Sequence, residues 1–390
     1  MRSPVLPASA DPSTVRIWNE RAVLATLTDG LPRRAAHIAE ATGLTPASVR
    51  AVLGTLTAKG WVCGLEPEQA GAMGRPARTF QRAHPDGLIL GVDLGGHAVR
   101  VVVSDLFGEP QVVGEAPVAS PDPFALRAAL ADALSPVDHS RVWMTGLAIS
   151  GALDAEGRLA RSLALPQLVG RRPADALADV LPGQVWTTHD TRSALWAEFM
   201  RGAARDARDV MFVSLGRRPS LSLLLDGRLH LGAHGSAGEL SLNELLPATN
   251  GYRWAVADGR DPQGDALRAA AAGDPAARAG ARAFLAEITP QLAYAAGLTD
   301  PALVVIGGAL APALESALPE FVEALGSRLQ VAPAVRLTEL DQFATATGAL
   351  LLAQQRVSAA LWDHPGALPP LTRTAFEDAL ASSKAQREHG

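Results

Sequence analysis

The stretch from Arg33 to Trp61 constrains this chain most, because its pattern is typical of a helix-turn-helix. A first helix is expected from about Arg33 to Thr42, and Gly43 supplies the left-handed residue that ends it. A second helix should begin after Thr45, since threonine is a favourable N-cap and proline is tolerated at the first helical position. Apolar residues then recur at three- and four-residue spacing, which buries one face. An ordinary helical hairpin shares this periodicity and stays open as an alternative.

The segment after these helices favours a winged helix over an ordinary hairpin. A loop follows Val62, and residues 74–80 are Gly-Arg-Pro-Ala-Arg-Thr-Phe. A prolyl turn flanked by arginines can place a guanidinium in a narrow minor groove, while the start of the second helix meets base edges in the major groove. The candidate DNA-binding residues are Arg34, Thr45, Ala47, Ser48, Arg50, Arg75 and Arg78.

The distribution of charge agrees with a head that meets nucleic acid. Residues 1–84 hold ten Arg and Lys against six Asp and Glu, a net of +4, so the rest carries −9 of the total of −5. A basic segment at residues 1–84 followed by an acidic remainder suits a protein that contacts phosphate through residues 1–84 alone. A net of +4 is modest, however, and decides little by itself.

Length and composition bound the remaining possibilities. The chain has 390 residues, enough for two or three domains. It has no apolar run of bilayer length, and its first residues lack the apolar core of a signal peptide, so we expect a cytoplasmic protein with no membrane partner. Cys63 is the only cysteine, which excludes an internal disulfide and a zinc site with more than one thiolate.

The expected elements divide the rest of the chain into two similar lobes. Strands are expected at 88–93, 98–104 and 110–116, a helix at 124–134 and a strand at 143–150. The order then repeats, with strands at 210–215, 221–225 and 228–231, a helix at 265–298, a strand at 303–306 and a helix after the double glycine at 307–308. Two β-β-β-α-β lobes predict an α/β protein with a two-lobed actin-like, ribonuclease H-like ATPase or sugar-kinase fold.

Five segments are therefore expected along the chain. They are a disordered lead-in at 1–13, a winged helix-turn-helix at 14–84, a first lobe at 85–205, a second lobe at 206–360 and a tail at 361–390. The last helix of the second lobe is free to return to the first lobe. The tail carries a short amphipathic helix.

Five motifs follow the winged helix in order. They are GVDLGGHAVRVVVSDLFGE at 91–109, ISGALD at 149–154, THDTRSALWAE at 188–198, AGEL at 237–240 and VVIGGALA at 304–311. Together with Asn19, Arg34 and the GRPAR of the wing, they resemble the ROK family (repressors, open reading frames and sugar kinases), specifically its repressor branch, over about residues 14–355. The resemblance implies a DNA-binding regulator of carbohydrate metabolism whose body senses an effector and dimerises.

This chain departs from the pattern of a working ROK kinase at both phosphate loops. The family's first motif is Asp-x-Gly-Gly-Thr-Lys, and His97 and Ala98 replace its Thr-Lys. The two glycines that remain are explained equally well by a hairpin turn. The second loop falls at 215–220, where Arg217, Arg218 and a proline obstruct the backbone donors that phosphate needs.

The sugar site and the structural zinc site of the family are also altered. Asp190 stands at the catalytic base position, although capping the helix that follows is an equal explanation. Glu239 matches the sugar-binding glutamate, but Leu242 replaces the zinc-binding histidine, so the family's structural zinc site cannot form. The candidate effector-binding residues are Gly151, His189, Asp190 and Glu239.

The leading hypothesis is a transcriptional regulator, of repressor type, with no catalytic residue, no cofactor and no metal. Its expected partners are a double-stranded DNA operator, a sugar or sugar-phosphate effector, and further copies of itself in a homodimer or a dimer of dimers. One alternative is an ATP-dependent sugar kinase that kept a DNA-binding head. Another is a scaffold whose head binds protein, which the arginines at 50, 75 and 78 disfavour.

Overall fold

The computed structural model of the chain describes residues 11–66, 78–120, 122–154, 156–162, 164–215, 219–238, 269, 272–362 and 366–388. The chain divides into two compact units. The first unit is Met1–Leu88, Ser104–Glu109 and Gln354–Gly390, and the second is Ile89–Val103 and Pro110–Ala353. The first unit thus contains segments from both ends of the chain and one short turn from between them.

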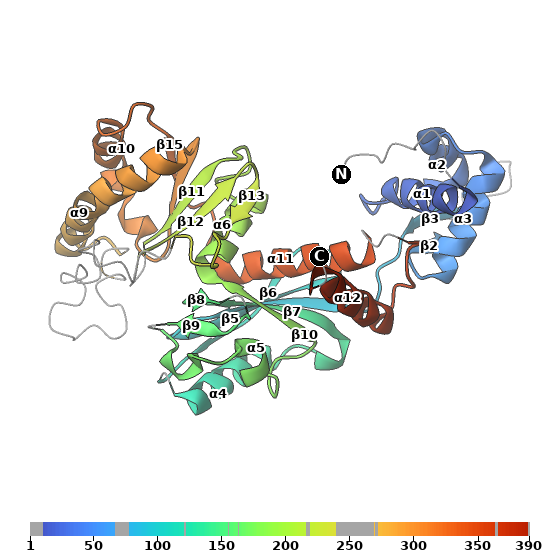
Figure 1. Cartoon of the computed structure of the whole chain (residues 1–390), viewed down its shortest axis with the longest axis horizontal. Helices are drawn as coiled ribbons and strands as arrows, with labels where there is room; N and C mark the ends of the chain where they lie inside the picture. Colours follow the sequence, from blue (N-terminus) through green and yellow to red (C-terminus); the bar gives the residue numbers. More distant parts are fainter. Residues whose placement is uncertain are drawn as a thin grey trace. The chain divides into compact units, whose positions relative to one another are not determined.

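The N-terminal part of the first unit is a winged helix-turn-helix (Figure 1). Its helices are α1 (Pro12–Ala25), α2 (Ala35–Thr42) and α3 (Pro46–Ala58), and its strands are β1 (Arg33–Arg34), β2 (Val62–Leu65) and β3 (Thr79–Arg82). Gly43 ends α2 with a φ of 71°, and the Thr45 side chain caps α3, as the sequence predicts. The three strands form an antiparallel sheet in the order β1-β3-β2.

The predicted start of the first helix at Arg33 is wrong by two residues. Arg33 and Arg34 are extended and pair with Phe80 and Thr79 of β3. The backbone groups of this pair are satisfied by the wing strand instead of by a helical turn, so α2 begins at Ala35. Residues 67–77, which include Arg75 of the predicted wing, lie outside the described residues.

The C-terminal segment of the chain packs within the same unit as the winged helix. Trp61 Nε1 donates to the Pro369 carbonyl at 2.8 Å, across 308 positions of sequence. The Leu371 amide donates to the Lys59 carbonyl at 2.7 Å. Leu368 and Phe376 are buried, and Phe376 belongs to α12 (Arg373–Glu388). The core of this unit is therefore built from both ends of the chain.

The buried carboxylate of Glu20 also links the winged helix to the C-terminal segment. Glu20 of α1 is only 1% exposed, and it accepts hydrogen bonds from Lys59 Nζ at 2.8 Å and from the Leu368 amide at 3.3 Å. The Trp61 ring also lies 6.2 Å from the ring of Phe107 and 6.3 Å from that of Trp362. A buried charge is tolerated only when it is paired and hydrogen-bonded, and here one of its donors comes from the C-terminal segment.

The first sheet of the second unit has the strand order β10-β7-β4-β5-β6. The strands are β4 (Leu88–Leu94), β5 (Ala98–Asp105), β6 (Gln111–Pro117), β7 (Val142–Ile149) and β10 (Gln184–His189), with α4 (Pro123–Leu134), α5 (Pro173–Ala176), α6 (Asp190–Arg201) and the short pair β8 (Ala152–Leu153) and β9 (Leu159–Arg161). Helix α11 (Ala344–Leu361) packs closely on this sheet, because side chains at Gly91 and Gly146 would clash with the Ala346 and Ala349 carbonyls.

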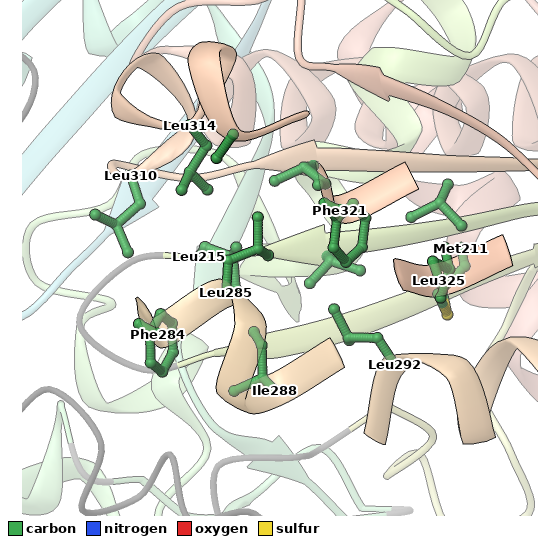
Figure 2. Packing of buried hydrophobic residues seen from close by; sticks show 14 of the residues in the cluster. Met211, Leu215, Phe284, Leu285, Ile288, Leu292, Leu310, Leu314, Phe321 and Leu325 are labelled. Carbon is green, nitrogen blue, oxygen red and sulfur yellow. The ribbon is translucent and has the colours of Figure 1, made fainter. Parts of the chain in front are cut away.

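The second sheet has the order β13-β12-β11-β14-β15. Its elements are β11 (Val210–Ser214), β12 (Ser220–Leu225), β13 (Arg228–His230), β14 (Leu303–Gly307) and β15 (Ala334–Leu337), with α9 (Pro275–Thr299) and α10 (Leu318–Gly326). Figure 2 shows Met211 and Leu215 packed among side chains of these helices, including Phe284, Ile288 and Phe321. This apolar core holds the second sheet against α9 and α10.

The predicted α/β fold with two sheets is confirmed, and its errors are local. The helix expected directly after the double glycine at 307–308 is wrong: short 3₁₀ turns precede α10, which begins at Leu318. Sequence reasoning also missed β10 and β15. Among the described residues, every helix is too short or too polar to cross a membrane.

Candidate functional sites

Helix α3 presents one face to the core and the opposite face to solvent. Val49, Val52, Leu53 and Leu56 are buried. Ala47 and Arg50 are exposed on the other side, and Arg50 makes no hydrogen bond or ion pair with any described residue. An exposed guanidinium with no intramolecular partner is free to meet a ligand.

Two other candidates on this helix have a structural role. Thr45 Oγ1 accepts from the Ser48 amide at 3.2 Å, and the two hydroxyl oxygens lie 2.9 Å apart. This pair satisfies the first turn of α3. As candidates for DNA contact, Thr45 and Ser48 are therefore weaker than Ala47 and Arg50.

The structure brings Arg34 and Arg78 to the same end of the small sheet. Arg34 pairs with Thr79, the neighbour of Arg78, and both arginines are exposed. The Arg78 guanidinium lies 5.7 Å from the centre of the Phe80 ring, and a side chain at Gly64 would clash with it. Arg78 thus lies along the sheet, and Arg75, the other candidate arginine of the predicted wing, lies outside the described residues.

The second candidate site lies where β10 meets α6. His189 ends β10 and is buried, and Asp190 begins α6. Asp190 Oδ1 lies 3.1 Å from His189 Nδ1 and accepts the Thr191 amide at 2.6 Å. The N-cap of α6 is His189, whose Nδ1 accepts the Thr191 amide at 3.3 Å, whereas Asp190, for which capping was the alternative explanation, is the first residue of the helix. Its side chain stays 29% exposed to solvent.

Asp93 of β4 is a further acidic group near Asp190 that the predicted site omits. Its side chain is 13% exposed, and burial raises the pKa of this carboxyl to about 7. Arg100 Nη1 at 3.5 Å opposes that increase, whereas the charges of Asp190 and Glu115 add to it. Arg100 was detectable as the one charged residue within the apolar run of β5, where it also pairs with Glu115 at 2.9 Å.

Replacing Asp93 by Asn should flatten the pH dependence of unfolding. The folded chain holds the Asp93 proton up to about pH 7, whereas the unfolded chain releases it near 3.8. This group therefore stabilises the fold below the unfolded value, and its contribution is lost as pH rises through 7. Urea unfolding of Asp93→Asn should gain about 1–3 kcal/mol over wild type from pH 4 to pH 8. Parallel pH profiles for the two proteins would contradict this assignment.

The other residues singled out in the sequence are either explained by the backbone or lie outside the described residues. Gly151 has a φ of 130°, and a side chain there would clash with the Arg161 carbonyl, so the backbone itself requires glycine. Arg192 Nη2 donates to the Gly235 carbonyl at 2.5 Å and holds the loop before Glu239. Glu239 and Leu242, and the two arginines at 217 and 218, lie outside the described residues.

Metal binding has no support within the part that the structure describes. There, no three His, Cys, Asp or Glu side chains gather into a possible site. Leu242, which stands where the family has its zinc-binding histidine, lies outside that part. The expected absence of zinc therefore stays a prediction.

A winged helix-turn-helix followed by two five-stranded mixed sheets defines a class of regulators and sugar kinases. An IclR helix-turn-helix domain model matches residues 22–63, and a ROK family model matches residues 89–249. Residues 89–249 thus match the ROK family and residues 22–63 an IclR-type helix-turn-helix, so the resemblance drawn from the motifs is confirmed.

Both regulators and enzymes are similar to this chain. The bifunctional enzyme NanE/NanK of Brucella melitensis is 34% identical over 212 residues, covering 50% of this chain and 40% of that protein. The DNA-binding transcriptional dual regulator NagC of Escherichia coli K12 is 25% identical over 239 residues, covering 60% and 59%. The chain therefore spans less than two thirds of either relative.

A solved structure is similar over nearly the whole chain. It is a ROK family transcriptional regulator, a homolog of the Escherichia coli MLC protein, and it superposes with a TM-score of 0.57 at 19% identity. The match covers 95% of this chain and 98% of that chain. At this identity the likeness concerns the fold alone.

Proposed function

We propose that this chain is a DNA-binding transcriptional regulator of repressor type, acting in the cytoplasm. One observation carries the proposal: the exposed face of α3 in an IclR-type helix-turn-helix presents Arg50 with no intramolecular partner among the described residues. Arginine reads guanine through two hydrogen bonds in the major groove. Arg34, Arg75 and Arg78 would add contacts at the wing and to phosphate.

The body of the protein would act as a sensor and as the dimerisation module. A single winged helix contacts few phosphates, and a two-fold operator calls for a two-fold protein. We therefore propose a homodimer or a dimer of dimers. A sugar or sugar phosphate would bind near His189, Asp190 and Glu239, with Gly151 shaping the backbone there.

The alternative is an ATP-dependent sugar kinase that kept a DNA-binding head. The proximity of Asp93 and Asp190, with Asp190 part exposed, favours it. Against it stand His97 and Ala98 in the first phosphate motif and the arginines and proline of the second. These replacements remove donors that a phosphate would need, so we propose a body without catalysis and without a cofactor.

Two arginine substitutions test the proposal, and their effects should differ in kind. Arg50→Ala should lower the preference for operator over random DNA by about 1–3 kcal/mol, because a guanine contact is lost. Arg75→Ala should mainly weaken binding at A/T-rich flanks, because the negative electrostatic potential of a narrow minor groove attracts arginine. Binding of both variants is measured on operator and scrambled duplexes at one salt concentration, since phosphate contacts make affinity steeply salt-dependent.

Arg50→Lys is the matched control for charge. It keeps the positive charge but loses the two-pronged contact, so it should resemble Arg50→Ala in specificity while retaining affinity for random DNA. The operator itself is found by genomic footprinting. Wild-type binding by both alanine variants would show that this face of α3 and the wing do not read DNA.

A further inference from the structure

Helix α3 contains a glycine that the fold does not require. Gly54 lies in the middle of the helix, is exposed, and has no positive φ. No atom of the described residues comes within 4 Å of the place that its Cβ would occupy. Glycine inside a helix is less stable than alanine, because it loses more conformational freedom on folding. An intermolecular reason for this glycine is therefore worth seeking.

Gly54 belongs to a line of small residues directly opposite the buried face of α3. Ala47, Ala51, Gly54 and Ala58 follow one another at four- and three-residue spacing, and all are exposed. Arg50 lies at the edge of this line and is the only charged residue of the helix. The line is thus a smooth surface with one long side chain beside it.

A smooth helix surface matters for entry into the major groove. The groove is about 12 Å wide, and a helix with its side chains is about 10–12 Å across. Removing side chains from the groove-facing line lets the helix axis approach the bases, which shortens the reach that Arg50 needs. Alanine methyl groups on the same line can then contact thymine C5-methyl groups.

We propose that Gly54 is a positioning residue for DNA recognition, which rests on the function proposed above. It lets α3 lie deep enough for Arg50 to meet a guanine while Ala47 and Ala51 contact neighbouring thymines. The recognised half-site would accordingly hold a guanine next to thymines. A side chain at position 54, one helical turn after Arg50, would hold that part of the helix, and with it Arg50, away from the bases.

Gly54→Ala should therefore have opposite effects on stability and on binding. The alanine should raise the thermal unfolding midpoint, since it suits the helix and meets open space. The same change should weaken operator binding about tenfold, or about 1.4 kcal/mol. Gly297→Ala is the matched control: Gly297 is also exposed, lies in α9, and its added methyl would meet Leu329 only at an ordinary 3.5 Å. That control should raise stability without changing DNA binding.

Uracil substitution tests the thymine contacts separately. Replacing each operator thymine by uracil removes one methyl group, and the wild type should lose several-fold affinity at the positions that Ala51 contacts. Ala51→Gly should abolish that sensitivity at the same positions, since the opposing methyl is gone. Equal losses in both proteins would overturn the assignment of these contacts.

The outcomes separate this inference from the proposed function. If the wild type binds no genomic site, the DNA-binding function itself fails. If the wild type binds operator and Gly54→Ala binds equally well, only the inference about Gly54 is overturned. A lower unfolding midpoint in Gly54→Ala would also overturn it, because the fold would then require the glycine.

Discussion

A chain that ends at Trp362 should lose operator binding while its second unit stays folded. The deleted residues supply partners to three groups of the winged helix: the Trp61 indole, the Lys59 carbonyl and the Glu20 carboxylate. They also supply the buried side chains of Leu368, Leu371 and Phe376. Without them, these three groups would lose their partners and the unit would lose three buried apolar side chains.

The expected effect is large compared with the stability of a small domain. Burying a leucine or phenylalanine side chain contributes about 1.5–3 kcal/mol, so these three side chains contribute roughly 5–9 kcal/mol as an upper estimate. A domain of this size is stable by about 5–15 kcal/mol in total. The winged helix of the shortened chain should therefore be largely unfolded at 25 °C.

Hydrogen exchange and operator binding check this prediction together. Amides of α3 should exchange rapidly in the shortened chain, whereas those of β11 and β14 keep their protection. A chain that ends at Ser382 is the control, because it retains Leu368, Leu371 and Phe376 and should bind DNA like the full chain. Operator binding within threefold of wild type by the chain ending at Trp362 would contradict the prediction.

No transfer of phosphate from Mg-ATP to a sugar should be detectable with this protein. Loss of one preorganised donor for developing charge lowers a rate by about 10²–10³-fold, and both phosphate loops have lost donors here. His97 stands in the first loop, and a proline without an amide proton stands at position 219 in the second. The combined loss should place any turnover at least about 10⁴-fold below that of a working kinase, whose typical kcat is about 1–100 s⁻¹.

A coupled assay over a panel of hexoses measures this, and Asp190→Asn is its control. In a regulator, the substitution should leave the background rate unchanged, because no transfer depends on the carboxylate. If the wild type phosphorylates a sugar and Asp190→Asn does not, the kinase alternative is correct. Micromolar affinity for Mg-ATP in calorimetry would contradict the prediction that the phosphate site is lost, even if no turnover is detected.

Several features of this protein could be predicted because their causes are local. Gly43 ends α2 because glycine adopts the left-handed conformation without steric cost, and Thr45 caps the next helix with its own hydroxyl. The alternation and β-branching of 98–104 predicted β5, and the motif order predicted the family. Each of these depends on residues close together in the chain.

Other features depend on contacts between distant segments, and sequence reasoning missed them. Nothing local indicates that Arg33 and Arg34 pair with the wing strand instead of starting a helix, because that choice depends on Phe80 and Thr79. Likewise, the raised pKa of Asp93 follows from burial and from the charges of Arg100, Asp190 and Glu115, which lie on other elements.

The sequence by itself thus determined the class of protein and the order of most of its elements, and it predicted which side of α3 would face DNA. Only the tertiary structure decided that Leu368, Leu371 and Phe376 are buried in the same compact unit as the winged helix. Amphipathic periodicity shows that a helix must bury one face, but it carries no information about which partner covers that face. The partner segment is selected by the shape of the surface around Trp61 and by the hydrogen-bonding groups on it. Trp61 lies 308 positions before Pro369, the residue whose carbonyl accepts its indole N–H.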